Sequence, residues 1–463
     1  MSPFGDVSND GTPGYPRQTL NGEKGIIVRH FSIFSVIAGA TLISFAPMAQ
    51  ADDTTMPGLA AIVLDSNPQI EAQRAAVRAL EARISAARGG YLPTVEANAL
   101  SQKRHLNLIG NAGDSTFVAA EVSVEARLRL FDGFRTSNAV DISSAEMASG
   151  KAILDGTISD VLLDLLRSAS DVHRDRLVRG FAQQQYDAIA EQLRGTSRRL
   201  SFGEATKTDE SQATARLATS ATGILSATES LEQSAAEFEA VSGRPADVVP
   251  PLPGLGMMPV SLEDATTVAQ AESPRLLAAK ASAAAAQKGI SFARGALAPT
   301  VDVVGGYDYI TGGIANLFTG RLPEDRSALY AGVEVRVPIF QGGRDYAEVR
   351  RAKALSDQRM SQVDQAARQV NQEVAVAWSR WKSAKAIIDA AQTAVTANER
   401  AADGVRKESI GGARTLLDVL DAQNELLAAR VTLERALRNE FVARATVLAT
   451  IGRLTPQLLK PAV

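Results

Sequence analysis

The clearest pattern in this chain is a two-residue alternation of apolar and polar side chains, which is typical of a β-strand with two different faces. The alternation runs through residues 118–130 and recurs through residues 329–339. The apolar positions are Val118, Ala120, Val122, Val124, Ala126, Leu128 and Leu130, then Leu329, Ala331, Val333, Val335, Val337 and Ile339. With the extended segments before them, these runs predict two strands in each half of the chain, over 91–106 and 116–131 and over 297–312 and 328–340.

Long helices are predicted after each strand pair, because residues 131–243 and 339–455 contain no proline and are rich in good helix formers. In the second run, apolar residues spaced alternately by four and three form a stripe typical of a coiled-coil seam. The stripe contains Val370, Val374, Ala377, Trp381, Ala384, Ile388, Ala391 and Val395. We interpret Trp381 as a packed core residue. A helix over 341–409 would be about 100 Å long, and helices over 413–451 and 274–296 together would match it.

The chain also contains an internal duplication. Around a glycine turn, the corresponding residues lie 209 positions apart: Gly203, Thr206 and Asp209 match Gly412, Thr415 and Asp418. A repeat of this length predicts two copies of one structural unit. We divide the chain into repeat 1 (52–244), a Pro-rich linker (245–260) that we expect to cross the surface, repeat 2 (261–455) and a C-terminal tail (456–463).

Residues 1–51 are predicted to be an N-terminal extension and a cleaved signal peptide. Lys24 and Arg29 precede an apolar run over 31–45, and Ala49 and Ala51 provide small residues for cleavage after Ala51. The apolar run is short for a permanent membrane anchor. The signal directs the mature chain out of the cytoplasm.

Composition argues against several classes of function. The 463 residues carry a formal net charge of -3, which gives no general attraction to nucleic acid. The chain has no cysteine, and the spacing of its three histidines, His30, His105 and His173, resembles no metal-ligand set. It has no Gly-x-Ser-x-Gly nucleophile motif and no GxxxxGK phosphate loop. We therefore expect no metal, no cofactor, no nucleic-acid partner and no enzymatic activity.

The strands and the signal together favour a transmembrane β-barrel, whose strands need about 9 to 11 residues. Apolar faces would then contact lipid, and charged faces would line a water-filled lumen. An ordinary soluble sheet could show the same alternation in a single strand. Because about eight strands is the smallest common closed barrel, four strands per chain predict an oligomer.

Several motifs occur in a duplicated order. The strand starts YLPTV (91–95) and LAPTV (297–301) correspond to each other, as do the strand-to-helix segments LFDG (130–133) and IFQGG (339–343). A turn segment, GARTLLDVLDAQ, occupies 412–423. In this order the motifs resemble the TolC family of trimeric outer-membrane efflux and export channels, over essentially the whole chain after residue 51.

The resemblance implies a mainly α fold with a membrane β part. Each chain would contribute four strands to a 12-stranded trimeric β-barrel that is continuous with a long α-helical coiled-coil barrel. It further implies a homotrimer in the lipid of the Gram-negative outer membrane that spans into the periplasm. Such a trimer would act with a periplasmic adaptor (membrane fusion) protein and an inner-membrane pump of RND or ABC type. Drugs, toxic compounds and secreted polypeptides all remain open as cargo.

The resemblance also assigns roles to residues of the turns. Asp418 and Asp421 correspond to acidic rings at the pore constriction, and Arg414 and Asp209 to the bond network that keeps the end closed. The adaptor-docking turns contain Gly203, Thr206, Gly411 and Gly412. Two positions depart from the family pattern, where Ser409 replaces a tyrosine and Gln212, not an acid, corresponds to Asp421.

Two alternatives remain open from the sequence. The acids near residue 418 are also favourable simply as the first turn of a helix, near the positive end of its dipole. A periplasmic coiled-coil adaptor or scaffold of an export system would also contain a long helical hairpin. It would, however, have one hairpin flanked by small β domains, and not two copies that each carry strands of membrane-spanning length.

Overall fold

The computed structural model describes residues 55–107, 114–311 and 325–459. The segment from Ala51 to Val463 forms one compact unit. The predicted signal peptide and its cleavage point at Ala51 lie outside the described residues. Helices predominate, and they follow the order that the duplication predicts.

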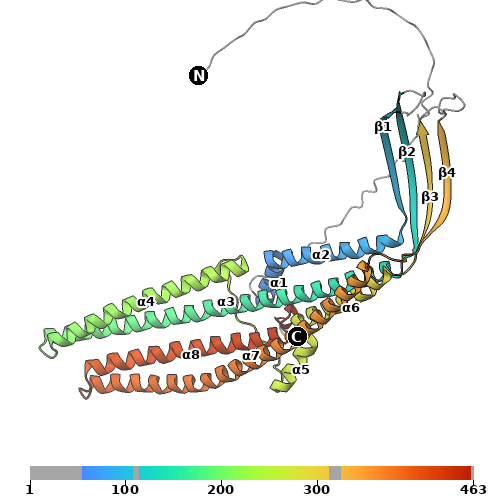
Figure 1. The fold of residues 1–463 in the computed structure, drawn as a ribbon. Coiled ribbons are helices and arrows are strands. Elements are labelled where there is room, and N and C mark those ends of the chain that lie inside the picture. Colours follow the sequence, from blue (N-terminus) through green and yellow to red (C-terminus); the bar gives the residue numbers. More distant parts are fainter. Residues whose placement is uncertain (1–54, 108–113, 312–324, 460–463) are drawn as a thin grey trace, which may run out of the picture. The chain divides into compact units, whose positions relative to one another are not determined.

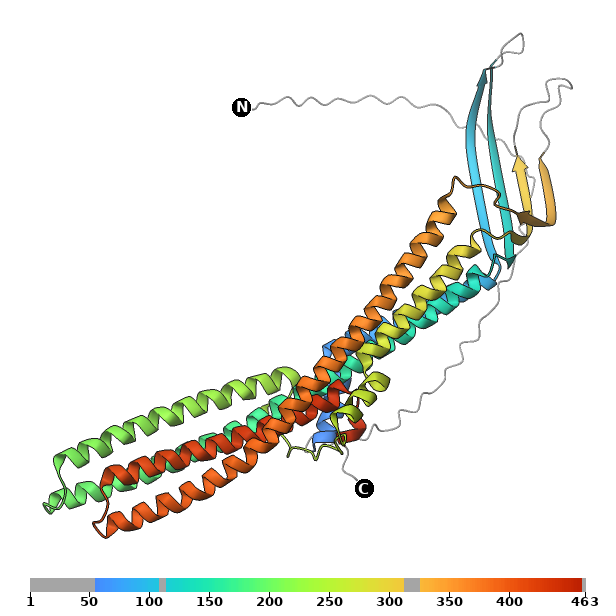
Figure 2. The ribbon, with the colours of Figure 1, turned by 60° about the horizontal axis from the view of Figure 1, so that its bottom comes forward.

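Each repeat contains two shorter helices before its strands and a helical hairpin after them (Figures 1 and 2). Each hairpin consists of a helix of 67 residues, α3 or α7, and a shorter antiparallel partner, α4 or α8. The helices are α1 (Met56–Ser66), α2 (Pro68–Arg88), α3 (Arg135–Ser201), α4 (Lys207–Ser242), α5 (Leu262–Glu272), α6 (Pro274–Gly295), α7 (Arg344–Ile410) and α8 (Leu416–Thr450). Short 3-10 helices are η1 (Gly89–Tyr91), η2 (Ala246–Val248) and η3 (Pro456–Leu459).

The duplicated helices begin at duplicated local signals. Pro68 and Pro274 occupy the first position of α2 and α6, where a helix needs no backbone N–H donor. The Asn67 side chain caps α2 by accepting hydrogen bonds from the backbone N–H groups of Gln69 (2.9 Å) and Ile70 (3.4 Å). Among the helices of the described segments, none combines the length and apolarity that crossing a bilayer would require.

The predicted coiled-coil seam of α7 is confirmed. Six of its eight residues are buried, namely Val370, Val374, Ala377, Ala384, Ala391 and Val395. Trp381 is half-buried against the core, and its indole Nε1–H donates a hydrogen bond to Glu440 Oε1 of α8 (2.9 Å). The α7 seam therefore packs in large part against the antiparallel helix of its own hairpin.

One large apolar core joins both repeats. It contains buried residues of all eight helices, and Phe238 of α4 is its largest fully buried side chain. The Pro-rich linker contributes Val249 and Leu255, and η3 contributes Leu459. The expected surface crossing is therefore only partly correct, because apolar linker side chains are removed from water while others, such as Met257, stay exposed.

Hydrogen bonds also fix the linker to the helices. On α3, Arg176 donates to the carbonyl of Ala246 (2.6 Å), and a ring nitrogen of His173 lies 2.9 Å from the carbonyl of Pro250. On α8, Arg444 donates to the carbonyls of Leu255 and Gly256. These bonds satisfy backbone carbonyls of the irregular linker and fix its path over α3 and α8.

The four predicted strands form one antiparallel sheet in the order β1-β2-β3-β4 (Figure 1). The strands are β1 (Thr94–Asn107), β2 (Asp114–Phe131), β3 (Thr300–Thr311) and β4 (Arg326–Arg336). At the centre of the register, Val122 pairs with Ala99 of β1 and Tyr309 of β3. Among the described residues of this single chain, β1 and β4 each have only one neighbouring strand, so the described sheet has two open edges.

The strand ends differ from the prediction at proline residues. β1 and β3 begin at Thr94 and Thr300, three residues later than expected and directly after Pro93 and Pro299. β4 ends at Arg336, two residues before Pro338 and four residues earlier than expected. Proline cannot donate to a strand ladder, so each of these positions limits the pairing.

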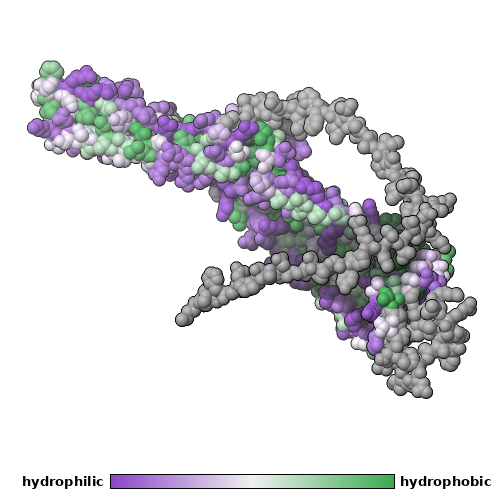
Figure 3. All heavy atoms as spheres, turned by 90° about the horizontal axis from the view of Figure 1, so that it is seen from above, coloured by the Kyte–Doolittle hydropathy of each residue, from purple (hydrophilic) through white to green (hydrophobic). Residues whose placement is uncertain are grey.

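The apolar face of the sheet is largely exposed. Val118, Val122, Val124 and Leu130 of β2 are all exposed, as are Leu329, Val333 and Val335 of β4. Figure 3 shows, by contrast, that the helical surface visible in that view is mostly polar, with scattered apolar patches. A continuous apolar face on a sheet that is not covered by the chain's own helices needs another apolar environment.

Candidate functional site

The candidate site comprises the two turns that close the helical hairpins. In each turn, a glycine follows the long helix in the left-handed region, with φ of +81° at Gly203 and +77° at Gly412. A Cβ atom would be strained at this φ, which explains the duplicated glycine. Gly411 differs, because its φ of -78° is accessible to any residue. Of the predicted turn glycines, backbone conformation therefore requires Gly203 and Gly412 only.

Both turns then start the next helix with the same reciprocal cap. Thr206 Oγ1 accepts from the backbone N–H of Asp209 (3.1 Å), and the Asp209 carboxylate accepts from the backbone N–H of Thr206 (2.9 Å). Thr415 and Asp418 make the same bonds at 3.2 Å and 2.9 Å. The duplicated Thr–Asp pair is thus a capping box, a device that satisfies two backbone donors at a helix start.

The capping bonds keep both acids ionised. The pKa of Asp418 is lowered below its usual range, chiefly because its carboxylate accepts the hydrogen bond from the Thr415 backbone. The pKa of Asp209 is lowered for the same reason by Thr206. Both capping bonds of Asp418 end on its Oδ2 atom. The helix-start role that the sequence left open is therefore real, and it leaves the second oxygen of Asp418 outside the cap.

We expect Thr415→Ala to destabilise the start of α8 by about 1 kcal/mol, the usual effect of removing an N-cap hydroxyl. Limited proteolysis within the α7–α8 turn should become faster. Thr432→Ala is a matched control, because the Thr432 hydroxyl only bonds back to the Ala428 carbonyl within α8. Equal proteolysis of the two variants would contradict a role for the cap.

Arg414 and Asp209 do not bond to each other within the chain. Arg414 Nε donates to Glu408 Oε2 (2.9 Å) across its own turn, and this bond raises the pKa of Arg414. Asp209 is engaged by its capping box. The predicted closing network between these two residues is not formed within one chain, and it stays a prediction.

Asp421 has a partner that the sequence did not suggest. Arg216 of α4 donates to Asp421 Oδ1 of α8 at 2.8 Å, which links the two hairpins. A small apolar cluster also joins the hairpins and consists of Ile189, Ala213, Leu416 and Leu420, with Leu193 and Leu217 packed against it. Arg216 and Asp421 each belong to a different repeat, and the duplication could not reveal a contact between positions that do not correspond.

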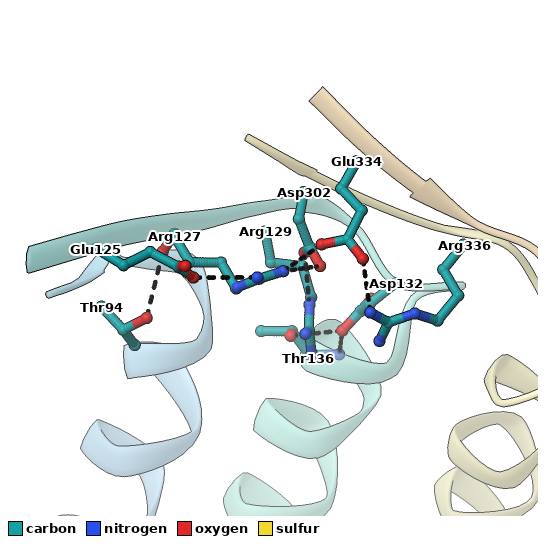
Figure 4. A network of polar contacts seen from close by, with 9 residues as sticks. All are labelled: Thr94, Glu125, Arg127, Arg129, Asp132, Thr136, Asp302, Glu334 and Arg336. Atoms are coloured by element: carbon teal, nitrogen blue, oxygen red, sulfur yellow. Dashed lines mark hydrogen bonds and ion pairs between the residues drawn. The ribbon is translucent and has the colours of Figure 1, made fainter. Parts of the chain in front are cut away.

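A second polar cluster crosses the sheet near the helices (Figure 4). Its centre is Arg127 of β2, which bonds to Glu334 (2.6 Å), Glu125 (3.0 Å) and Asp302 (3.4 Å). Arg129 donates to the other oxygen of Asp302 at 3.0 Å. Asp302 is almost fully buried, at 3% exposure, so its two arginine partners are needed to stabilise its charge. The cluster fixes strands β2, β3 and β4 to one another on the polar face.

Together, these features define a class of protein. An open sheet with an exposed apolar face continues into two long helical hairpins, and polar side chains are gathered on the opposite face of the sheet. This is the architecture of a membrane duct.

Comparison with known proteins identifies the family. The model of the family described as outer membrane efflux protein matches residues 59–244 and 266–453, one match in each repeat. The outer membrane efflux protein BepC of Brucella suis biovar 1 (strain 1330) is 28% identical over 428 residues, which cover 92% of this chain and 91% of BepC. The outer membrane protein TolC of Escherichia coli (strain K12) is 24% identical over 92% of this chain and 87% of TolC.

A solved structure shows the same fold. The outer-membrane channel OprN superposes with a TM-score of 0.73 at 19% sequence identity, covering 87% of this chain and 91% of OprN. The chain belongs to the outer membrane efflux protein family. This result confirms the predicted fold class, the outer-membrane location and the export function. It also excludes an enzyme and the periplasmic adaptor alternative.

Proposed function

We propose that three copies of the chain assemble into one export duct with a 12-stranded barrel. The observation that carries this proposal is the open sheet of four strands, whose edge strands β1 and β4 each lack a second neighbour in the part of the chain that the structure describes. Four strands are too few to close a barrel, whereas three such sheets exceed the common minimum of about eight. Pairing of β4 with β1 of the next copy removes every free edge.

In this assembly one face of the sheet contacts lipid and the other lines the water-filled lumen. The exposed apolar side chains of β2 and β4 contact lipid, and the polar cluster around Arg127 and Asp302 faces the lumen. The charges of the cluster balance, because Arg127, Arg129 and Arg336 are matched by Glu125, Asp302 and Glu334. A neutral lining of this kind would allow passage of cargo with either sign of charge.

The hairpin turns are the proposed contact with a periplasmic adaptor, through which an inner-membrane pump of RND or ABC type delivers cargo. Two apolar side chains are left in water at the ends of the long helices, Phe202 at 80% exposure and Ile410 at 82%. Both side chains lie beside the turns, and we propose that the adaptor buries them. Drugs, toxic compounds and polypeptides are the proposed cargo classes.

Around the three-fold axis, the turns also form the proposed constriction. Three copies of Asp418 and Asp421 place six carboxylates around the pore, where they attract cations. Arg414 and Asp209 of neighbouring chains supply the closing network. Both assignments follow the family resemblance of the turn, and the lowered pKa of Asp418 supports a charged ring at neutral pH.

Single-channel conductance measurements test whether Asp418 and Asp421 line the constriction. We expect Asp418→Asn combined with Asp421→Asn to weaken the block of single-channel current by Ca²⁺ roughly tenfold, because six negative charges leave the pore. Asparagine keeps an oxygen that can accept the capping bond from Thr415. Asp389→Asn with Asp403→Asn on α7 is a control for loss of charge elsewhere. A trimeric channel with unchanged block in the first variant would refute the ring and leave the duct intact.

A further inference from the structure

Of the four charged groups assigned to the turns, Asp421 alone is paired with a residue of the other hairpin. Asp418 and Asp209 are held by the caps of their own helices, and Arg414 by Glu408 of its own turn. Asp421 instead accepts a hydrogen bond from Arg216, at 2.8 Å between Nη2 and Oδ1. A pore carboxylate that carries a guanidinium partner is not equivalent to a free one.

The apolar cluster between the hairpins fixes this pair. Ala213 lies one turn before Arg216 on α4 and is fully buried, as is Leu420, the residue next to Asp421 on α8. With Leu217 and Leu416 in the same cluster, the packing determines how α4 faces α8. An exposed ion pair gains little in water, but a packed scaffold that fixes the two helices reduces the side-chain entropy lost on pairing.

The pair also stays in contact with water. The Arg216 side chain is 38% exposed and that of Asp421 is 51% exposed, so a dissolved cation can reach the carboxylate only in competition with the guanidinium. Arginine stays protonated at all relevant pH values. Its charge therefore acts on Asp421 as a permanent competitor of any cation.

We propose that Arg216 is a specificity-determining residue of the duct, because it is the resident counter-ion of Asp421 and sets how strongly the constriction binds divalent cations. The proposal rests on the trimeric constriction of the proposed function. In the paired state Asp418 is the less masked acid of each chain, because its cationic neighbour Arg414 is hydrogen-bonded to Glu408 and one Asp418 oxygen lies outside the cap. When α4 and α8 separate, Asp421 is released and the negative charge available in the pore increases.

The test is Ca²⁺ block of the purified trimer in planar bilayers. Arg216→Gln should strengthen the block roughly fivefold, the effect expected when an exposed opposite charge is removed at close range. In an Asp421→Asn background the same substitution should have no effect, because the carboxylate that it unmasks is gone. Arg216→Lys keeps the charge, so Ca²⁺ should block this variant as strongly as it blocks the native channel.

Arg194→Gln is the matched control. Arg194 pairs with Glu191 within α3, so this variant removes the same charge and an arginine–carboxylate pair from the same hairpin, but one that does not join the two hairpins. An equal change in Arg194→Gln would overturn the proposal in favour of a general charge effect. An unchanged block in Arg216→Gln, while Asp418→Asn with Asp421→Asn still weakens it, would overturn the role of Arg216 and leave the constriction standing. If Ca²⁺ blocks none of the variants, both fail.

Discussion

Val122→Arg should remove most of the heat-sensitive trimer from the outer membrane. Val122 lies on the exposed apolar face of β2, with paired strands on both sides, at Ala99 and at Tyr309. An arginine on the lipid face of a membrane barrel costs roughly 2–4 kcal/mol near the midplane. In the proposed trimer, this cost arises three times in one barrel. Membrane fractionation and gel electrophoresis with and without heating measure the result.

Ser123→Arg is the control for this experiment. Ser123 is the next residue of β2, so its side chain points to the polar face, between Asn98 and Asp308. An arginine there meets the proposed water-filled lumen and should leave the amount of trimer close to normal. If both variants assemble equally well, the apolar face does not contact lipid.

The second large effect is expected from Phe238→Ala. Phe238 has no exposed surface and belongs to the core that joins both repeats and the linker. Replacing a buried phenylalanine by alanine costs about 3–5 kcal/mol, because apolar contacts are lost and a cavity remains. Thermal unfolding of the detergent-solubilised protein, followed by circular dichroism, should show a clear drop in the transition temperature.

Phe202→Ala is the control that distinguishes the loss of core packing from the loss of adaptor binding. This phenylalanine lies at the end of α3 and is mostly exposed, so its removal should leave thermal unfolding nearly unchanged. Its loss should instead weaken adaptor binding, if the turns are the docking surface. If Phe238→Ala lowers the transition temperature no more than Phe202→Ala does, the two repeats do not unfold as one cooperative unit.

Most of the fold could be predicted because its local signals are strong and occur twice. The period-two alternation of β2, the proline-free helices and the glycine turns each depend on residues that are close in sequence. The predicted long helix over 341–409 is observed as Arg344–Ile410. The strand ends were predicted less well, because apolar patterning extends past Pro338 whereas backbone pairing does not.

The site was only partly predictable. The acids of the turns follow from motif position, but the contact between Arg216 and Asp421 joins residues 205 positions apart that do not correspond in the two repeats. The burial of Asp302 was hidden for the same reason, since it depends on Arg127 and Arg129 of another strand. Pairing between distant charged side chains leaves no periodic signal in a single sequence. The duplication, by contrast, predicts that corresponding residues of the two repeats have similar surroundings. It does not predict contacts between residues that do not correspond.

The open edges of the sheet impose an order on biogenesis. Before assembly, a lone chain exposes the unpaired backbone of β1 and β4 beside an apolar face, which is a template for mispairing and aggregation. The helical hairpins have no such hazard, because their backbone hydrogen bonds are internal to each helix. In the proposed trimer, pairing of β4 with β1 of the next copy removes these edges, so the strands are the part of a lone chain that most needs protection before assembly.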